Sequence, residues 1–115
     1  MSTRPEILSV QCEGDTARLS LRIPQDLMYF RGHFEQMPLL PGVVQVDWAI
    51  QLARQQFQMP PQFKKLSALK FMRVLSPGGT IELLLHWQSA SGELSFRYAW
   101  AEQAYSSGRV QFSHA

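Results

Sequence analysis

Residues that could carry out acid–base chemistry are concentrated in one stretch of the chain. His33 stands in a segment punctuated by Pro38, Pro41 and Gly42, and Asp47 follows in the early turns of a helical pattern. An unperturbed histidine titrates at about pH 6.5, so at neutral pH it can accept a proton and return it. A histidine base with a nearby carboxyl group suits removal of a proton beside a carbonyl.

The start of the predicted helix offers a second part of such a site. The helix begins near Gly42, and its first backbone N–H groups, with those of Gly42 and Val43 among them, have no acceptor within the helix. The positive end of the helix dipole helps such donors to hold a carbonyl oxygen on which negative charge develops. Gln51 follows Asp47 by one turn on the same face, so its amide is placed to orient the carboxyl group.

The same residues also fit a structural interpretation. A single loop histidine is commonly a hydrogen-bonded structural residue. An aspartate among polar neighbours is commonly part of the solvated face of an amphipathic helix. The periodicity alone leaves both interpretations open.

One helix and a series of strands must position these residues. Between Pro41 and Pro60 the apolar residues recur at helical spacing, and the helix is about 22 Å long at about 1.5 Å per residue. One side of it carries Val46, Ala49, Ile50, Ala53 and Phe57, and the other carries Asp47, Gln51, Arg54, Gln55 and Gln58.

Alternation of apolar and polar residues predicts antiparallel strands on both sides of the helix. The strands are expected at 7–11, 17–23, 66–75, 81–87, 94–100 and 109–113. Turn signals separate them at Glu13-Gly14-Asp15, Pro60-Pro61, Ser76-Pro77-Gly78-Gly79, Ser91-Gly92 and Ser106-Ser107-Gly108. We therefore predict an α+β fold in which a curved antiparallel sheet wraps one long central helix, as a single domain over 1–115.

Composition narrows the classes of function. The chain has 115 residues, 45% of them hydrophobic, and a net charge of +2 from scattered basic residues, which does not favour nucleic-acid binding. One cysteine and three widely separated histidines give no metal-ligand spacing. No apolar run is long enough for a membrane span and the first residues do not read as a secretory signal, so a cytoplasmic, metal-free protein is expected.

The predicted fold also predicts an assembly. One helix covers only one face of the sheet, and the outer strands keep unpaired backbone groups. Two copies placed edge to edge would satisfy those groups. We therefore expect a symmetric homodimer.

Two blocks of the sequence resemble the β-hydroxyacyl-[acyl-carrier-protein] dehydratases of fatty acid synthesis. The first block is Gly32-His33-Phe34, Pro38, Pro41-Gly42-Val43 and Asp47 with Gln51, at the spacing of that family's signature. The second block, 69–79, is similar to the strand and turn that follow the helix in those enzymes. The short chain, together with 105–109, resembles the small ApeI-type dehydratases of aryl polyene gene clusters more closely than the housekeeping enzymes. The departures from the family pattern are Glu35, Trp48 and Gly79.

The resemblance implies a hot-dog fold with active sites at a dimer interface. It implies that His33 comes from one subunit and Asp47 from the other, while the N–H of Gly42 holds the thioester carbonyl. His33 would remove the proton beside the thioester, and Asp47, oriented by Gln51, would assist departure of the hydroxyl as water. The substrate would be a 3-hydroxyacyl group on the phosphopantetheine arm of an acyl carrier protein and the product a trans-2-enoyl thioester, with no metal or redox cofactor.

Bulky apolar residues surround the motif. They would line an acyl or aryl tunnel, although core packing is an alternative role for most of them; they are Phe30, Phe34, Met37 and Trp48. Two other functions fit the same fold. One is a hot-dog acyl thioesterase, whose helical carboxylate activates water. The other is a non-catalytic dehydratase-like subunit of a heterodimer with a related hot-dog chain.

Overall fold

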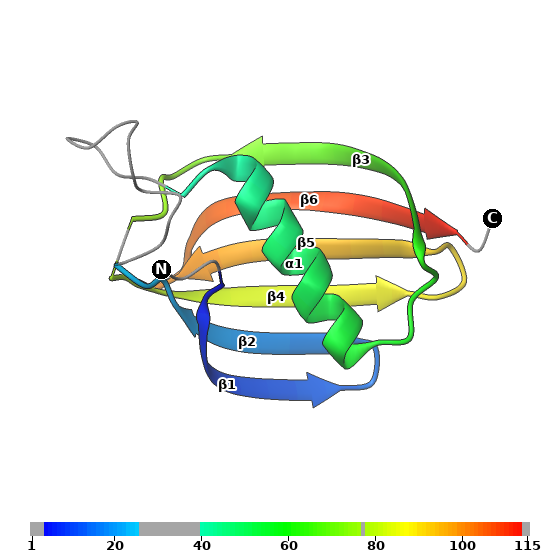
Figure 1. The fold of residues 1–115 in the computed structure, drawn as a ribbon, viewed down its shortest axis with the longest axis horizontal. Helices are drawn as coiled ribbons and strands as arrows, with labels where there is room; N and C mark the ends of the chain where they lie inside the picture. The colour runs from blue at the N-terminus through cyan, green and yellow to red at the C-terminus, as the bar shows by residue number, and fades with distance from the viewer. Residues whose placement is uncertain (1–3, 26–39, 77, 114–115) are drawn as a thin grey trace.

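The protein is described by a computed structural model over residues 4–25, 40–76 and 78–113 (Figure 1). Six strands and one helix occur in these ranges. In chain order they are β1 (Glu6–Glu13), β2 (Thr16–Arg22), α1 (Gly42–Gln56), β3 (Gln62–Phe71), β4 (Thr80–Gln88), β5 (Glu93–Trp100) and β6 (Gln103–Ser113).

The strands form one antiparallel sheet in the order β1-β2-β4-β5-β6-β3. Helix α1 joins β2 to β3, which is the far edge strand, and it crosses one face of the curved sheet obliquely (Figure 1). This is the predicted arrangement of a sheet around a central helix. The edge strands are β1 and β3.

The core lies between α1 and the sheet because the strands alternate as expected. In β4, for example, Ile81, Leu83 and Leu85 are buried, whereas the residues between them are partly exposed. The buried face of α1 is wider than predicted, because a concave sheet contacts more of the helix than a flat one. The buried face contains the predicted Val46, Ala49 and Ala53, and also Val44, Gln45, Trp48 and Leu52.

Three predicted strand boundaries are wrong: both ends of the strand expected at 66–75 and the start of the strand expected at 109–113. The strand expected at 66–75 is β3, Gln62–Phe71. Its start was missed because a bulge between Phe63 and Lys65 breaks the alternation there. Its end comes early because the N–H groups of Met72 and Arg73 both donate to the Tyr105 carbonyl, at 2.8 and 3.1 Å, and leave the ladder.

The turn predicted at Ser106-Ser107-Gly108 is also wrong, because these residues lie inside β6, which begins at Gln103. The chain reverses instead at Ala101 and Glu102, whose φ values of 50° and 68° suit a two-residue hairpin. Gly108 has a packing role. A Cβ atom there would lie 2.7 Å from Cε2 of Phe96, so only glycine lets that ring rest on β6.

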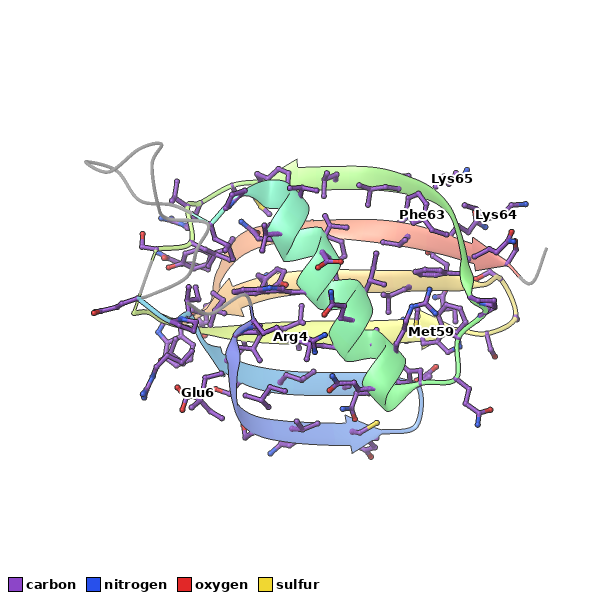
Figure 2. All side chains as sticks on the ribbon, viewed as in Figure 1. Arg4, Glu6, Met59, Phe63, Lys64 and Lys65 are labelled. Atoms are coloured by element: carbon purple, nitrogen blue, oxygen red, sulfur yellow. The ribbon has the colours of Figure 1, made fainter. Side chains whose placement is uncertain are left out.

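Strand β3 is an exposed edge that carries both apolar side chains and lysines. All ten of its residues are exposed, and Phe63 and Phe71 keep 54% and 50% of their surface accessible. Figure 2 shows Phe63, Lys64 and Lys65 at the margin of the sheet, where β3 begins. Only β6 pairs with β3, so its other side offers backbone groups for strand pairing.

We predict that Gly108→Ala destabilises the protein by about 1–3 kcal/mol, because the new methyl group must displace the Phe96 ring. Gly79→Ala is the matched control. Its Cβ would meet only the Ser76 carbonyl at 3.5 Å, so stability should change by no more than about 0.5 kcal/mol. Urea unfolding of the two variants measures both values, and equal midpoints would contradict the packing role of Gly108.

Candidate active site

The described residues contain only part of the predicted site. His33 lies outside them, as do the predicted tunnel residues Phe30, Phe34 and Met37, so their placement stays a prediction. Helix α1 carries the remainder of the predicted set, which is Gly42, Val43, Asp47, Trp48 and Gln51.

Asp47 and Gln51 form the contact that their spacing indicated. The Gln51 amide donates a hydrogen bond to Oδ2 of Asp47, with 2.7 Å between the heavy atoms. Asp47 is exposed and Gln51 is half-buried, so the carboxyl group is accessible while one of its oxygens is fixed in direction. Such a carboxyl group can bind or release a proton at its other oxygen.

The first turn of α1 leaves backbone donors uncapped. Pro41 precedes the helix and has no side-chain cap, and its carbonyl accepts from the N–H groups of Val44 and Gln45 at 3.1 and 3.2 Å. Within the described ranges no acceptor is recorded for the N–H groups of Gly42 and Val43. The first turn also has no acidic residue, so the positive end of the helix is not neutralised there. An electron-rich oxygen would be stabilised at this position.

Gly42 has a packing role as well. A Cβ atom at this position would lie 2.9 Å from Cε1 of Phe71 and closer still to its Cζ. Phe71 ends β3 and is half exposed, so its ring shields the helix start from one side. The glycine therefore permits close packing of an aromatic side chain of the edge strand against the first residue of the helix.

Gln45 was not singled out from the sequence, yet it organises this end of the helix. It is 3% exposed, and its amide nitrogen donates to the Leu40 carbonyl at 3.1 Å. The hydroxyl of Ser106 donates to Oε1 of Gln45 at 2.7 Å. Leu40 in turn donates its N–H to the Leu75 carbonyl at 2.8 Å. The Gln45 side chain thus joins the helix, the segment that enters it and strand β6.

A signal for Gln45 is present in the sequence. It stands between Val44 and Val46 and shares the buried side of the helix with Ala49 and Leu52. A polar residue on an apolar face implies buried partners, since an unpaired amide costs about 1–3 kcal/mol. Those partners, Ser106 and Leu40, cannot be named without the fold.

Tyr98 links the same network to Asp47. Its hydroxyl donates to the backbone carbonyl of Gln45 at 2.7 Å. Burial raises the pKa of the Tyr98 phenol well above its ordinary value, and the charge of Asp47 raises this pKa further. Asp47 is therefore close enough for its charge to act on Tyr98, which stays a neutral hydrogen-bond donor.

Residues 9–109 match the protein family described as ApeI-like, the ApeI dehydratases. The chain belongs to the ApeI-like dehydratase family. This confirms the resemblance to the hot-dog dehydratases that the Gly32-His33-Phe34 and Pro41-Gly42-Val43 motifs indicated.

Solved structures confirm the hot-dog fold. The dehydratase heterocomplex ApeI:P from Xenorhabdus doucetiae contains a chain that is 32% identical, with a TM-score of 0.87 over 94% of this chain and 96% of that one. An uncharacterized protein from Erwinia carotovora subsp. atroseptica is also 32% identical, with a TM-score of 0.79 over 93% of this chain and 94% of that one.

A curated relative is the 3-hydroxyacyl-[acyl-carrier-protein] dehydratase FabZ of Roseobacter denitrificans. It is 29% identical over 87 residues, which make up 67% of this chain and 57% of that protein. The ApeI-like chain therefore spans little more than half the length of this relative.

Other features of the ApeI-like chain bear on the site. Trp48, predicted as a tunnel residue, is 2% exposed and packs in the core between α1 and the sheet. Among the described residues no group of three His, Cys, Asp or Glu side chains is placed to hold a metal ion. In the same residues no helix is long and apolar enough to cross a membrane.

We predict that Gln45→Leu destabilises the protein by about 2–4 kcal/mol, because it leaves the Ser106 hydroxyl and the Leu40 carbonyl buried without Gln45 as a partner. Ser106→Ala should cost less. The double variant should lose less stability than the sum of the two single losses, because the hydroxyl left without a partner is then removed. Chemical denaturation of the four proteins measures the coupling, and additive effects would contradict a shared network.

The raised pKa of Tyr98 predicts how the stability of the protein depends on pH. The folded state raises the pKa of this phenol above the value of about 10 that applies when unfolded, so above that pH the folded state retains the proton longer. Stability should be unaffected by this group below about pH 10 and should fall as pH rises further. Tyr98→Phe should lose about 1 kcal/mol at pH 7 with its hydrogen bond, and its stability should fall less steeply at alkaline pH.

Unfolding midpoints measured from pH 7 to pH 11 would check this. Tyr105→Phe is the matched control, because Tyr105 is half-buried on β6 and the variant should keep the wild-type profile. A Tyr98→Phe protein with the wild-type alkaline slope would contradict the linkage.

Proposed function

We propose that this chain dehydrates 3-hydroxyacyl thioesters, carried on the phosphopantetheine arm of an acyl carrier protein, to trans-2-enoyl thioesters. Membership of the ApeI-like family over residues 9–109 is the observation that carries the proposal. The accessible Asp47 carboxyl group, oriented by Gln51 on the central helix, supports it. Fatty acid or aryl polyene biosynthesis in the cytoplasm is the proposed setting.

The proposed chemistry moves two protons. His33 takes the proton from the carbon between the thioester carbonyl and the hydroxyl-bearing carbon, and the new carbon–carbon double bond forms from that electron pair. Asp47 gives a proton to the departing hydroxyl, which leaves as water. The cycle ends when His33 releases its proton and Asp47 regains one. Dehydration is redox-neutral, so the proposed reaction requires no metal or redox cofactor.

The uncapped helix start has a role in the same step. As the proton leaves, negative charge develops on the thioester oxygen. The N–H groups of Gly42 and Val43 would hold this oxygen at the positive end of α1. Gly42 adds no side chain of its own beside these donors, and the Phe71 ring packs against it on one side.

The proposal requires two chains. Strand β3 supports a dimer because it is an edge strand with Phe63 and Phe71 exposed, and strand pairing would cover both apolar side chains and backbone groups. In such a homodimer we propose that His33 of one subunit faces Asp47 of the other. Each dimer would then contain two sites.

A heterodimer is the second candidate. The similar chain from Xenorhabdus doucetiae comes from a dehydratase heterocomplex, which favours a related hot-dog subunit as an alternative partner. In that case the chain would supply structure or one half of a site. Purified alone, it would be inactive until the related subunit is added.

We predict that the purified homodimer converts 3-hydroxyacyl carrier substrates to enoyl products, followed by mass spectrometry of the carrier. His33→Ala and Asp47→Ala should each lower kcat by about 10²–10⁴-fold, the usual contribution of a positioned acid or base. Gln55→Ala, an exposed position on the same helix, is the control and should retain activity.

Mixing the two inactive variants tests the shared site. Half of the dimers would be mixed, and each mixed dimer would have one intact site, so activity should recover to about a quarter of the wild-type value. No recovery after confirmed subunit exchange would argue against a site built from two chains. Release of free carrier thiol without enoyl product would instead identify a thioesterase.

A further inference from the structure

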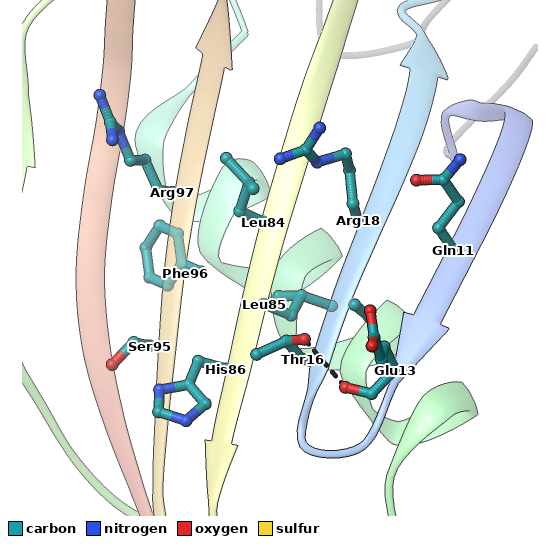
Figure 3. Close-up of a pocket in the computed structure, with 11 residues that line it drawn as sticks. Gln11, Glu13, Thr16, Arg18, Leu84, Leu85, His86, Ser95, Phe96 and Arg97 are labelled. Atoms are coloured by element: carbon teal, nitrogen blue, oxygen red, sulfur yellow. Dashed lines mark hydrogen bonds between the residues drawn. The ribbon is translucent and has the colours of Figure 1, made fainter.

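The face of the sheet opposite α1 carries a groove that the proposed function does not use. It has a volume of about 600 Å³ and is lined by side chains of β1, β2, β4 and β5. Figure 3 shows Arg18 and Arg97 on the two sides of Leu84, with His86 and Ser95 below them. A smaller hollow of about 270 Å³, lined by Lys70 and Arg109 among others, continues across β6 and β3 and shares Ser95 and Phe96 with the groove.

The strand register arranges the cations of this face in a row. Arg18 lies opposite Leu84, which lies opposite Arg97 on its other side. Arg97 then pairs with Ser107, and Ser107 pairs with Lys70. A basic side chain therefore occurs on every second strand from β2 to β3, and Arg109 occupies the next row, opposite Ser95.

Within the described part of the chain these cations have no ion-pair partner. Arg22 pairs with Glu6, and His86 contacts Asp15 through a hydrogen bond, but no ion pair found there involves Arg18, Arg97, Lys70 or Arg109. The carboxylates of this face lie at its margins and on neighbouring rows. Glu13 lines the β1 end of the groove, Glu6 pairs with Arg22, and Glu82 and Glu93 occupy other rows.

The spacing of the row matches the repeat of an acidic helix. Neighbouring strands are about 4.8 Å apart, so cations on every second strand are about 10 Å apart. Residues seven apart on an α-helix lie on the same face about 10.5 Å apart. Three carboxylates at seven-residue spacing would therefore meet Arg18, Arg97 and Lys70 in turn.

We propose that this row of cations, with the groove beside it, is a docking surface for an acidic helix of a partner protein. The helix would lie across the strands, with its carboxylates over the row and the smaller side chains between them over Leu84. This surface does not rely on the proposed catalytic function. A second copy of the chain is a poor occupant, because it would bring the same unpaired cations face to face.

The test uses two synthetic helical peptides of equal length, composition and net charge. One carries glutamate at every seventh position over three positions, and the other carries the same glutamates at five-residue spacing, which spreads them around the helix. Binding to the full chain is measured by fluorescence anisotropy at low and high salt. The first peptide should bind about tenfold more tightly, and its affinity should fall as salt rises.

Variants locate the binding on the surface. The double variant Arg18→Gln with Arg97→Gln should bind the first peptide about tenfold more weakly than the wild type. The single variant Arg97→Gln should bind it with intermediate affinity. Arg22→Gln is the matched control, because Arg22 faces the same side, lies off the row and already pairs with Glu6. It should bind within about twofold of the wild type.

Three results would overturn the proposal. Equal affinity for the two peptides would remove the spacing argument. Tighter binding of a single-stranded oligonucleotide with the same charge would indicate a nucleic-acid surface. A change of molecular mass in solution on Arg18→Gln with Arg97→Gln, measured by light scattering on folded protein, would show that copies of the chain meet through this face.

Discussion

The packing of helix α1 against the concave sheet is the constraint on which the remainder of the structure depends. Trp48, Ala49 and Leu52 exclude water along its length, and burial of such side chains contributes about 25 cal/mol per Å² of apolar surface. Apolar burial alone does not fix how the helix is placed along the sheet. The hydrogen bonds of Gln45 do, because they form in only one placement of α1. The orientation of Asp47 toward solvent follows from both.

The same packing also holds the start of the helix, where the proposed oxyanion donors lie. A buried network at Gln45 holds the first turn in place from the sheet side, through Ser106 and Tyr98. The N–H groups of Gly42 and Val43, which have no capping side chain, are thereby held in fixed positions. Donors fixed before the reaction need no reorganisation as charge develops, which is the condition for effective electrostatic stabilisation.

A single helix cannot cover a six-stranded sheet on all sides, and the uncovered parts have different characters. The β3 edge exposes Phe63 and Phe71 beside unpaired backbone groups and suits pairing with a similar chain. The face opposite α1 is cationic, with Arg18 and Arg97 unpaired among the described residues, and suits an acidic partner. The two proposed contact surfaces therefore differ in the side chains that they present.

Much of this was determined by local pattern in the sequence. Period-two alternation predicted the strands, helical periodicity predicted α1 from Gly42, and the one-turn spacing predicted the contact between Asp47 and Gln51. The motif around His33 and Pro41-Gly42-Val43 indicated the family, which the match over residues 9–109 confirms.

Tertiary structure alone decided the features that join distant segments. Gly108 looked like a turn residue, yet it serves as a contact for Phe96, a residue of the neighbouring strand. Gln45 looked like a polar residue of a helix, but its partner Ser106 lies 61 positions away. The cation row exists only because antiparallel pairing places Arg18 and Arg97 on either side of β4. Contacts of this kind depend on which strands are neighbours, and the alternation within one strand does not specify its neighbours.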